Sequence, residues 1–253
     1  MKIVRVDTKT DDITYGGVEP EGIRLYRGSP FVAWEPTETV VDWEAARLLA
    51  PVIPTKIVCV GRNYVGHAEE MGNEIPEQPL LFLKPPTTVI GPMQQIRYPA
   101  SSNELSYEAE LAVVIGTVTR NVDIEDVGPH IMGYTAANDI TARDHQRTDG
   151  QWTRAKGFDT FCPLGPAIDT DIDPQEGLSI ISRVNGDIRQ SGSTADMVFG
   201  VGHLVSYISN IMTLLPGDVI LTGTPEGVGL VNPGDKIEVQ IEGIGVLTNT
   251  VSS

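Results

Sequence analysis

Two glutamates at the start of an apolar stretch are the first residues whose types and spacing indicate chemistry. The stretch from Ser106 to Gly116 carries Glu108 and Glu110, and its second half is apolar and rich in β-branched residues, which predicts a buried strand. Because side chains alternate between the faces of a strand, both carboxylates are expected to point the same way. Adjacent anions repel each other and lose hydration there, and a hard divalent cation such as Mg²⁺, Mn²⁺ or Ca²⁺ relieves both costs. The alternative is a strand whose first residues remain in solvent, and the spacing alone leaves both interpretations open.

Further polar residues downstream extend this predicted site. A strand of small residues from 133 to 137 ends in a dense polar segment, in which Asp139 is the expected third carboxylate. Arg143 and Gln146 follow, and each has a planar group that pairs well with a carboxylate. Lys156 lies before a glycine in a loop, where a lysine is either simply exposed or directed into a site.

A second cluster of polar residues precedes the glutamates. Asn63 as an N-cap and Gly72 as a stop predict a short helix, on which His67 and Glu70 lie three residues apart and share a face. A helix of this length is marginal unless it is packed or bound to a ligand, so it is expected to act as a lid. The alternative is a solvated His-Glu pair on a surface turn.

Two other polar positions lie at the ends of predicted strands. Lys84 ends the apolar strand that begins at Leu80, and it is expected to extend its ammonium into solvent. The glycine-rich loop from Gly223 to Gly229 follows another strand but lacks the Gly-Lys-Ser/Thr of a phosphate-binding loop. Its backbone N–H groups and the Thr224 hydroxyl are therefore expected to bind a small carboxylate.

Composition excludes several classes of partner. The chain has 253 residues, 40% of them hydrophobic and 21% charged, and its formal net charge is −16. With no basic run, it is expected to bind neither nucleic acid nor an anionic membrane, and an anionic substrate needs a local cation. No apolar run reaches membrane-spanning length and no signal-peptide pattern is present, so a cytoplasmic protein is expected. Cys59 and Cys162 are expected to be buried free thiols.

The remaining pattern predicts a mostly β chain of two parts. Residues 1–53 form a small β-rich N-terminal domain of short strands separated by turns, and residues 54–253 form the catalytic domain. Asn185-Gly186 predicts a tight hairpin, and apolar residues at helical spacing predict a core-facing helix from Val201 to Leu215. A closing hairpin is expected over residues 236–242 and 246–251.

Six separate stretches resemble one family, in the right order between Pro54 and the C-terminus. They are Gly61-Arg62-Asn63-Tyr64 with His67 and Glu70, Phe82-Leu83-Lys84-Pro85, Tyr107-Glu108-Ala109-Glu110-Leu111, Asn138 to Asp144, Lys156 to Thr160, and Leu221 to Gly229. Each piece alone is a weak signal, but together they closely resemble the fumarylacetoacetate hydrolase family. The first 51 residues look like the short N-terminal domain of its bacterial members.

The resemblance implies an α+β, mostly β fold, a mixed β-sheet roll, usually assembled as a homodimer. It implies Mg²⁺ or Mn²⁺ held by Glu108, Glu110 and Asp139. His67 and Glu70 would form a water-activating pair on a mobile lid helix, with Lys156 as an electrophilic stabiliser. The residues implied to bind substrate are Arg143, Gln146, Thr224 and, with a weaker motif match, Thr160.

One departure from the animal enzymes narrows the expected chemistry. Those proteins have an additional carboxylate ligand shortly before the catalytic histidine, and residues 60–64 contain none. The chain therefore resembles the three-carboxylate branch, which includes acylpyruvate hydrolases, oxaloacetate decarboxylases and 2-hydroxyhepta-2,4-diene-1,7-dioate isomerases of aromatic-compound catabolism.

Four functions remain as hypotheses. The leading one is metal-dependent hydrolysis of a C–C bond in an acylpyruvate-like 2-oxo acid through a metal-stabilised enolate, because His67 and Glu70 are both present. The same site would also serve oxaloacetate decarboxylation or isomerisation of an unsaturated dioic acid. A non-enzymatic, metal-stabilised binding protein is less favoured, because the lid residues and Lys156 are retained.

Overall fold

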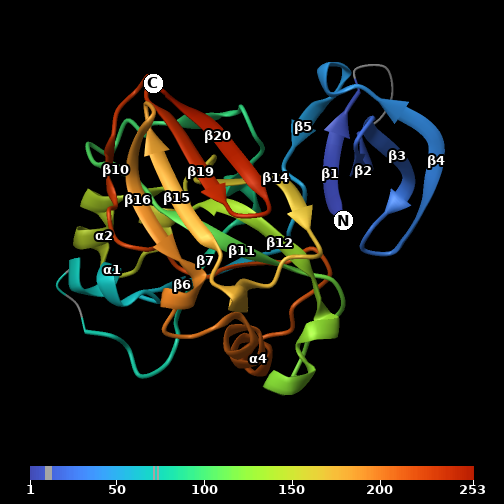
Figure 1. Ribbon diagram of the computed structural model, residues 1–253. Coiled ribbons are helices and arrows are strands. Elements are labelled where there is room, and N and C mark those ends of the chain that lie inside the picture. The colour runs from blue at the N-terminus through green and yellow to red at the C-terminus, as the bar shows by residue number, and fades with distance from the viewer. Residues whose placement is uncertain (9–12, 71, 73) are drawn as a thin grey trace.

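The computed structural model describes residues 1–8, 13–70, 72 and 74–253. Its described residues form three β-sheets with few helices, as expected for the mostly β class. Strands β1 to β4 stand at one side of the molecule, and the other strands form a β-rich body with helix α4 below it in the view of Figure 1. Parallel pairs, such as β17 with β6, occur beside antiparallel ones, so the sheets are mixed.

The large sheet runs through the whole molecule. Its order is β4 (Ala33–Val41), β3 (Gly22–Ser29), β2 (Thr14–Glu19), β1 (Lys2–Asp7), β14 (Cys162–Asp169), β12 (Ile131–Asn138), β11 (Ala109–Ile115), β17 (Val219–Leu221), β6 (Ile57–Gly61) and β7 (Leu80–Lys84). Strand β5 (Arg47–Leu49) also pairs with β1, and β8 (Val89–Ile90) pairs with β14. The N-terminal strands therefore join the rest of the chain through β1 and β14, and the division between residues 53 and 54 stays a prediction.

Two smaller sheets and the helices complete the fold. One sheet has the order β13 (Thr141–Ala142), β10 (Leu105–Tyr107) and β18 (Gly229–Val231). The other has the order β16 (Asp187–Ser193), β15 (Ser179–Val184), β19 (Lys236–Ile241), β20 (Gly245–Ser252) and β9 (Gln95–Arg97). The α-helices are α1 (Val65–Glu70), α2 (Arg143–Asp149), α3 (Thr153–Lys156) and α4 (Val201–Ile211). Short 3-10 helices cover Trp43–Ala45, Pro86–Thr88, Ile124–Asp126, Gly128–His130, Pro174–Glu176 and Thr194–Asp196.

Strand β11 lies at the centre of the large sheet and is buried along its whole length. Its side chains alternate between two parts of the core: Ala112 packs in one apolar cluster with Cys59 and Cys162, whereas Val113 packs in another with Leu204 of α4. A strand covered on both faces reads as a continuous apolar run, which explains the sequence from Leu111 to Ile115. Both cysteines are free and buried, as predicted.

The predicted strand from Ser106 to Gly116 is divided between two sheets. Its first part is β10 in the three-stranded sheet, its second part is β11, and Glu108 lies at the break. There the Asn138 side chain replaces a strand partner, because its Oδ1 accepts the Glu108 N–H at 3.0 Å. The chain thus changes sheet at the first glutamate.

The other predicted elements are found with small differences. The hairpin of β15 and β16 turns at Asn185 and Gly186, whose φ angles of 54° and 92° match the turn that this dipeptide favours. The apolar pattern of the last helix extends to Leu215, but α4 ends at Ile211. It ends there because Leu214 exchanges two backbone hydrogen bonds of 2.9 Å with Thr119. None of the described helices is long and apolar enough to span a membrane.

Asp218, just before β17, connects three segments of the core. Its fully buried carboxylate accepts hydrogen bonds from the backbone N–H groups of Thr55, Lys56 and Leu215, and from the Lys56 ammonium at 2.5 Å. Burial by itself raises the pKa of Asp218, but the hydrogen bonds from Lys56 and Thr55 outweigh it and hold the pKa below 3.8.

Replacing Asp218 by asparagine is expected to lower the free energy of unfolding by about 1.5–3 kcal/mol, because hydrogen bonds to a charged acceptor are lost. Since the pKa is depressed in the folded state, this contribution is present above pH 3.8 and disappears as the pH falls through the folded-state pKa. Urea unfolding of wild type and Asp218→Asn at a series of acidic pH values measures it. The exposed Asp187→Asn variant is the control, and equal losses in both variants would contradict the prediction.

Candidate active site

Three carboxylates converge where β11 and β12 meet. Ala109 pairs with Asn138 in this antiparallel ladder, so the glutamates on either side of Ala109 face the residue after Asn138, which is Asp139. One oxygen each of Glu108, Glu110 and Asp139 lies within 4.8 Å of the others, and all three residues are buried. The structure therefore brings together the three predicted ligands, including the one distant in sequence.

Cationic side chains surround two of these carboxylates. Lys156 Nζ lies 2.8 Å from Glu108 Oε2 and 2.7 Å from Asp139 Oδ2, and it is itself buried. Arg143 Nη2 lies 2.6 Å from Glu108 Oε1, and Arg143 Nη1 donates to Gln146 Oε1 at 3.0 Å. Lys156 is thus directed into the site rather than exposed, which resolves the alternative that its position before a glycine left open.

Lys84 does not extend into solvent, and that expectation is wrong. Its side chain is fully buried, with Nζ 2.5 Å from Asp139 Oδ1 and 3.2 Å from the backbone oxygen of Ile140. The reason lies in the sheet: β7 is paired with β6, and its last residue points inward beneath Asp139. The neighbouring apolar residues give no sign of this, because the acidic partner is distant in sequence.

The electrostatics distinguish the two glutamates. Burial by itself raises the pKa of Glu108, but Lys156 and Arg143 outweigh it and hold that pKa well below its usual range. Burial lowers the pKa of Lys156, but Asp139 and Glu108 raise it above its ordinary value. The pKa of Glu110 is raised well above normal, first by burial and then by repulsion from Asp139 and Glu108.

These residues fit a hard cation. Glu110 accepts a hydrogen bond of 2.6 Å from the Gly223 N–H, but within the described chain no lysine or arginine pairs with it. A carboxylate so buried and repelled is stabilised by a positive charge beside it, and the three oxygens are ligands that Mg²⁺ and Mn²⁺ prefer. Glu108, Glu110 and Asp139 are therefore the residues that would hold the metal.

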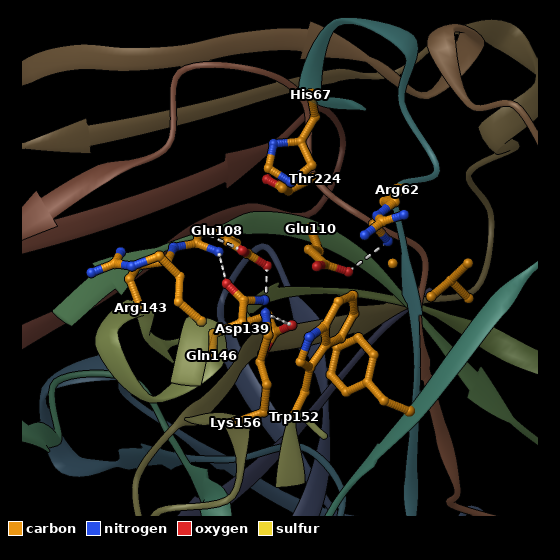
Figure 2. A pocket seen from close by; sticks show the side chains of 15 residues that line it. Arg62, His67, Glu108, Glu110, Asp139, Arg143, Gln146, Trp152, Lys156 and Thr224 are labelled. Atoms are coloured by element: carbon orange, nitrogen blue, oxygen red, sulfur yellow. Dashed lines mark hydrogen bonds and ion pairs between the residues drawn. The ribbon is translucent and has the colours of Figure 1, made fainter. Parts of the chain in front are cut away.

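His67 approaches the cluster from the opposite side to Lys156 (Figure 2). It lies on α1, it is buried, and its Nδ1 has no hydrogen-bond partner among the described residues. Burial lowers the pKa of His67, which favours the neutral imidazole. Asn63 is not the N-cap of this helix, because its side chain instead donates to the backbone oxygens of Thr222 and Phe199.

Glu70 is near His67 but is bonded elsewhere. Its Oε2 lies 3.6 Å from His67 Nδ1, whereas both of its oxygens lie 3.1 Å from the Gly227 N–H. Glu70 does not line the cavity that contains His67. The two residues share a helix face as predicted, but the structure shows no hydrogen bond between them.

The glycine-rich loop binds carboxylates of this same chain. The Gly223 N–H donates to Glu110 and the Gly227 N–H donates to Glu70, so the loop fixes the positions of both carboxylates. The Thr224 hydroxyl donates to the Ala109 backbone oxygen at 2.8 Å and accepts from Gln190 Nε2 at 2.7 Å. Sequence reasoning missed Gln190, which is fully buried on β16 and connects that sheet to the site.

A cavity of about 310 Å³ contains these groups. Among the predicted site residues, its lining includes His67, Glu108, Glu110, Asp139, Arg143, Gln146, Lys156 and Thr224. It also includes Arg62, Phe82, Arg147 and Trp152, which the sequence did not single out. Thr160 does not line it; the Thr160 hydroxyl accepts the Arg97 N–H at 2.9 Å, and a role in substrate binding stays a prediction.

A mostly β fold with a buried acidic cluster, two buried lysines and a histidine over them defines the class of protein. The chain belongs to the fumarylacetoacetate hydrolase family, because the model described as Fumarylacetoacetate (FAA) hydrolase C-terminal matches residues 56–252. A second model, described as Rv2993c-like, N-terminal, matches residues 1–51. The chain is accordingly an enzyme of this superfamily with a buried acidic site suited to a divalent metal.

Individual relatives are similar over most of their length. Protein Rv2993c of Mycobacterium tuberculosis is 51% identical over 220 residues, which cover 85% of this chain and 83% of that protein. The human mitochondrial oxaloacetate tautomerase FAHD2B is 43% identical over 225 residues, 84% of this chain and 71% of that protein. The crystal structure of 2-hydroxyhepta-2,4-diene-1,7-dioate isomerase from Mycobacterium marinum has a TM-score of 0.92 at 43% identity, covering 100% of this chain and 98% of that one.

Proposed function

We propose that this protein catalyses metal-dependent proton transfer at the carbon next to the keto group of a small 2-oxo acid, as a tautomerase or isomerase. The observation that carries the proposal is the buried His67 imidazole, with an unpartnered Nδ1, in the same cavity as the acidic cluster. A neutral imidazole at this place is a general base of suitable strength.

The residues of the chain have distinct tasks in this reaction. Glu108, Glu110 and Asp139 would hold a divalent cation, which would supply Lewis acidity for a keto oxygen of the substrate. His67 removes the proton from the neighbouring carbon and returns it to the product. Lys156 holds a fixed positive charge on the side of the site opposite His67. This charge would stabilise the negative charge that develops on the keto oxygen of the substrate. Arg143 and Gln146 lie at one end of the cavity and bind the carboxylate of the 2-oxo acid.

Proton transfer is favoured over hydrolysis by the position of Glu70. Tautomerisation needs one base, whereas attack by water needs an assembled pair, and Glu70 is bonded to the Gly227 N–H rather than to His67. The names of two relatives, an oxaloacetate tautomerase and a dioate isomerase, support the same choice. We therefore propose proton transfer as the leading function, ahead of the hydrolysis that the sequence alone favoured.

Hydrolysis of an acylpyruvate remains the second candidate. A separation of 3.6 Å between His67 Nδ1 and Glu70 is short enough that a small movement of α1 would pair them. Decarboxylation of oxaloacetate would use the same cluster without an attacking water.

The homodimer implied by the family resemblance stays a prediction. A measurement of the molar mass in solution would test it.

An assay of metal dependence tests the proposal. With Mg²⁺, the purified protein is expected to accelerate the conversion of enol to keto oxaloacetate, which is measured as a decrease in the absorbance of the enol. Dialysis against EDTA should abolish this acceleration. Adding Mn²⁺ or Mg²⁺ back should restore it. Release of pyruvate from acetylpyruvate, without any acceleration of the oxaloacetate conversion, would identify a hydrolase and contradict the proposal.

A further inference from the structure

Arg62 is the one cation of the cavity that the described residues leave without an acidic partner. Arg147 pairs with Glu104 at 2.8 Å, and Arg143 and Lys156 both pair with Glu108. Within the described chain, by contrast, Arg62 has neither an ion pair nor a hydrogen bond from its side chain, although it lines the same cavity. In a protein of net charge −16, an arginine so placed is a local positive charge that suits an anion.

The backbone at Arg62 is held in a conformation that arginine rarely adopts. Its φ angle is 58°, in the left-handed region, where a non-glycine residue is strained. The next residue, Asn63, is fully buried and maintains this turn, because its side chain donates to Thr222 O at 2.7 Å and accepts the Phe199 N–H at 2.8 Å. Glycine would adopt the turn more easily, so the presence of an arginine here carries a conformational cost.

The wall beside Arg62 is apolar and closely packed. Trp152 lies over Gly61, where an added Cβ would come within 2.8 Å of the indole, and the Trp152 and Phe82 rings meet edge to face at 5.3 Å. Figure 2 shows Arg62 and Arg143 on opposite sides of the acidic cluster, with Trp152 below the Arg62 side. The cavity thus has a cation at each side and an apolar wall next to one of them.

We infer that Arg62 binds the second, distal carboxylate of a dianionic 2-oxo acid and selects such substrates over monoanionic ones. The inference rests on the proposed function, because it assumes that the first carboxylate and keto group lie at the acidic cluster. The guanidinium offers two parallel N–H donors to the distal carboxylate, and the aromatic wall covers the carbon chain between the two charged ends.

Binding calorimetry on the Mg²⁺-loaded full chain tests this assignment without relying on turnover. The probes are two matched pairs that differ only in the distal carboxylate: 2-oxoglutarate with 2-oxopentanoate, and 2-oxoadipate with 2-oxohexanoate. Arg62→Met is expected to weaken binding of whichever diacid binds the wild-type protein more tightly by about 10- to 100-fold, because a hydrogen-bonded charge is lost. Binding of the matched monoacid should be unchanged. Arg62→Lys should fall between wild type and Arg62→Met, because it retains charge without the planar pair of donors.

Two further variants serve as controls. Arg154→Met removes an exposed positive charge from α3, outside the cavity lining, and should leave the preference for diacids intact. Arg147→Met removes another cation of the lining, and a selective loss of diacid binding in that variant instead would overturn the assignment to Arg62. Thermal unfolding of each variant verifies that it is folded.

The outcomes separate this inference from the proposed function. A wild-type protein that binds diacids and monoacids equally, or an Arg62→Met variant that weakens both alike, overturns the role of Arg62 only. A wild-type protein that binds none of the four probes overturns the 2-oxo acid class on which both proposals depend. A protein whose preference for diacids is lost in Arg62→Met but which does not tautomerise oxaloacetate leaves the role of Arg62 supported and the proposed reaction wrong.

Discussion

The Asp139→Asn variant is expected to lose divalent-metal binding and, in EDTA, about 3–5 kcal/mol of its free energy of unfolding. Asp139 is the carboxylate shared by two buried ammonium groups, with Lys84 at 2.5 Å and Lys156 at 2.7 Å. An amide in its place leaves both charges in a dry environment with only part of their hydrogen bonds. Urea unfolding in EDTA isolates this effect from any stabilisation by metal, and titration with Mn²⁺ measures the loss of binding.

A second substitution provides the matched control. In the double variant Asp139→Asn/Lys84→Met, the Lys84 charge, whose acidic partner is Asp139, is removed as well, whereas Lys156 still pairs with Glu108. Part of the lost stability should therefore return while metal binding remains absent. If Asp139→Asn unfolds at the same urea midpoint as the wild-type protein, the two buried lysines do not need this carboxylate for the stability of the fold.

The His67→Gln variant is expected to slow tautomerisation about 10²- to 10⁴-fold, the usual contribution of a positioned general base. Its stability should remain close to that of wild type, because His67 Nδ1 has no hydrogen-bond partner among the described residues. Because burial lowers the pKa of His67, the wild-type rate should persist into mildly acidic solution and fall only below pH 6.5, as the imidazole takes up a proton. Stopped-flow rates across this pH range measure both effects.

His203→Gln is the control, because His203 is exposed on α4 and lies outside the cavity lining. Glu70→Gln distinguishes the two candidate reactions: tautomerisation should lose less rate than in His67→Gln, since Glu70 binds the Gly227 N–H. Equal losses in both variants would instead favour a water-activating pair and hydrolysis. If the rate of His67→Gln falls at acidic pH in the same way as the wild-type rate, a group other than His67 causes that pH dependence.

Several elements of the fold follow from local patterns. The Asn185-Gly186 hairpin and the apolar helix after residue 200 were predictable, because turn chemistry and apolar spacing act over a few residues. The break between β10 and β11 was not predictable, since the Asn138 side chain that takes the place of a strand partner is distant in sequence. Asn63 was misread as a helix cap for the same reason, because its partners, Thr222 and Phe199, lie far along the chain.

The amino-acid sequence by itself determined which ligands are available: three carboxylates at spacings that suit a hard cation, and the six stretches that identify the family. The tertiary structure alone decided which charges are paired, placing Lys84 beneath Asp139, fixing Thr224 through Gln190 and leaving Arg62 open to the cavity. The physical reason is that a buried charge is stabilised only by groups within a few ångströms of it. Here those groups come from strands and loops that only the folded sheets bring together.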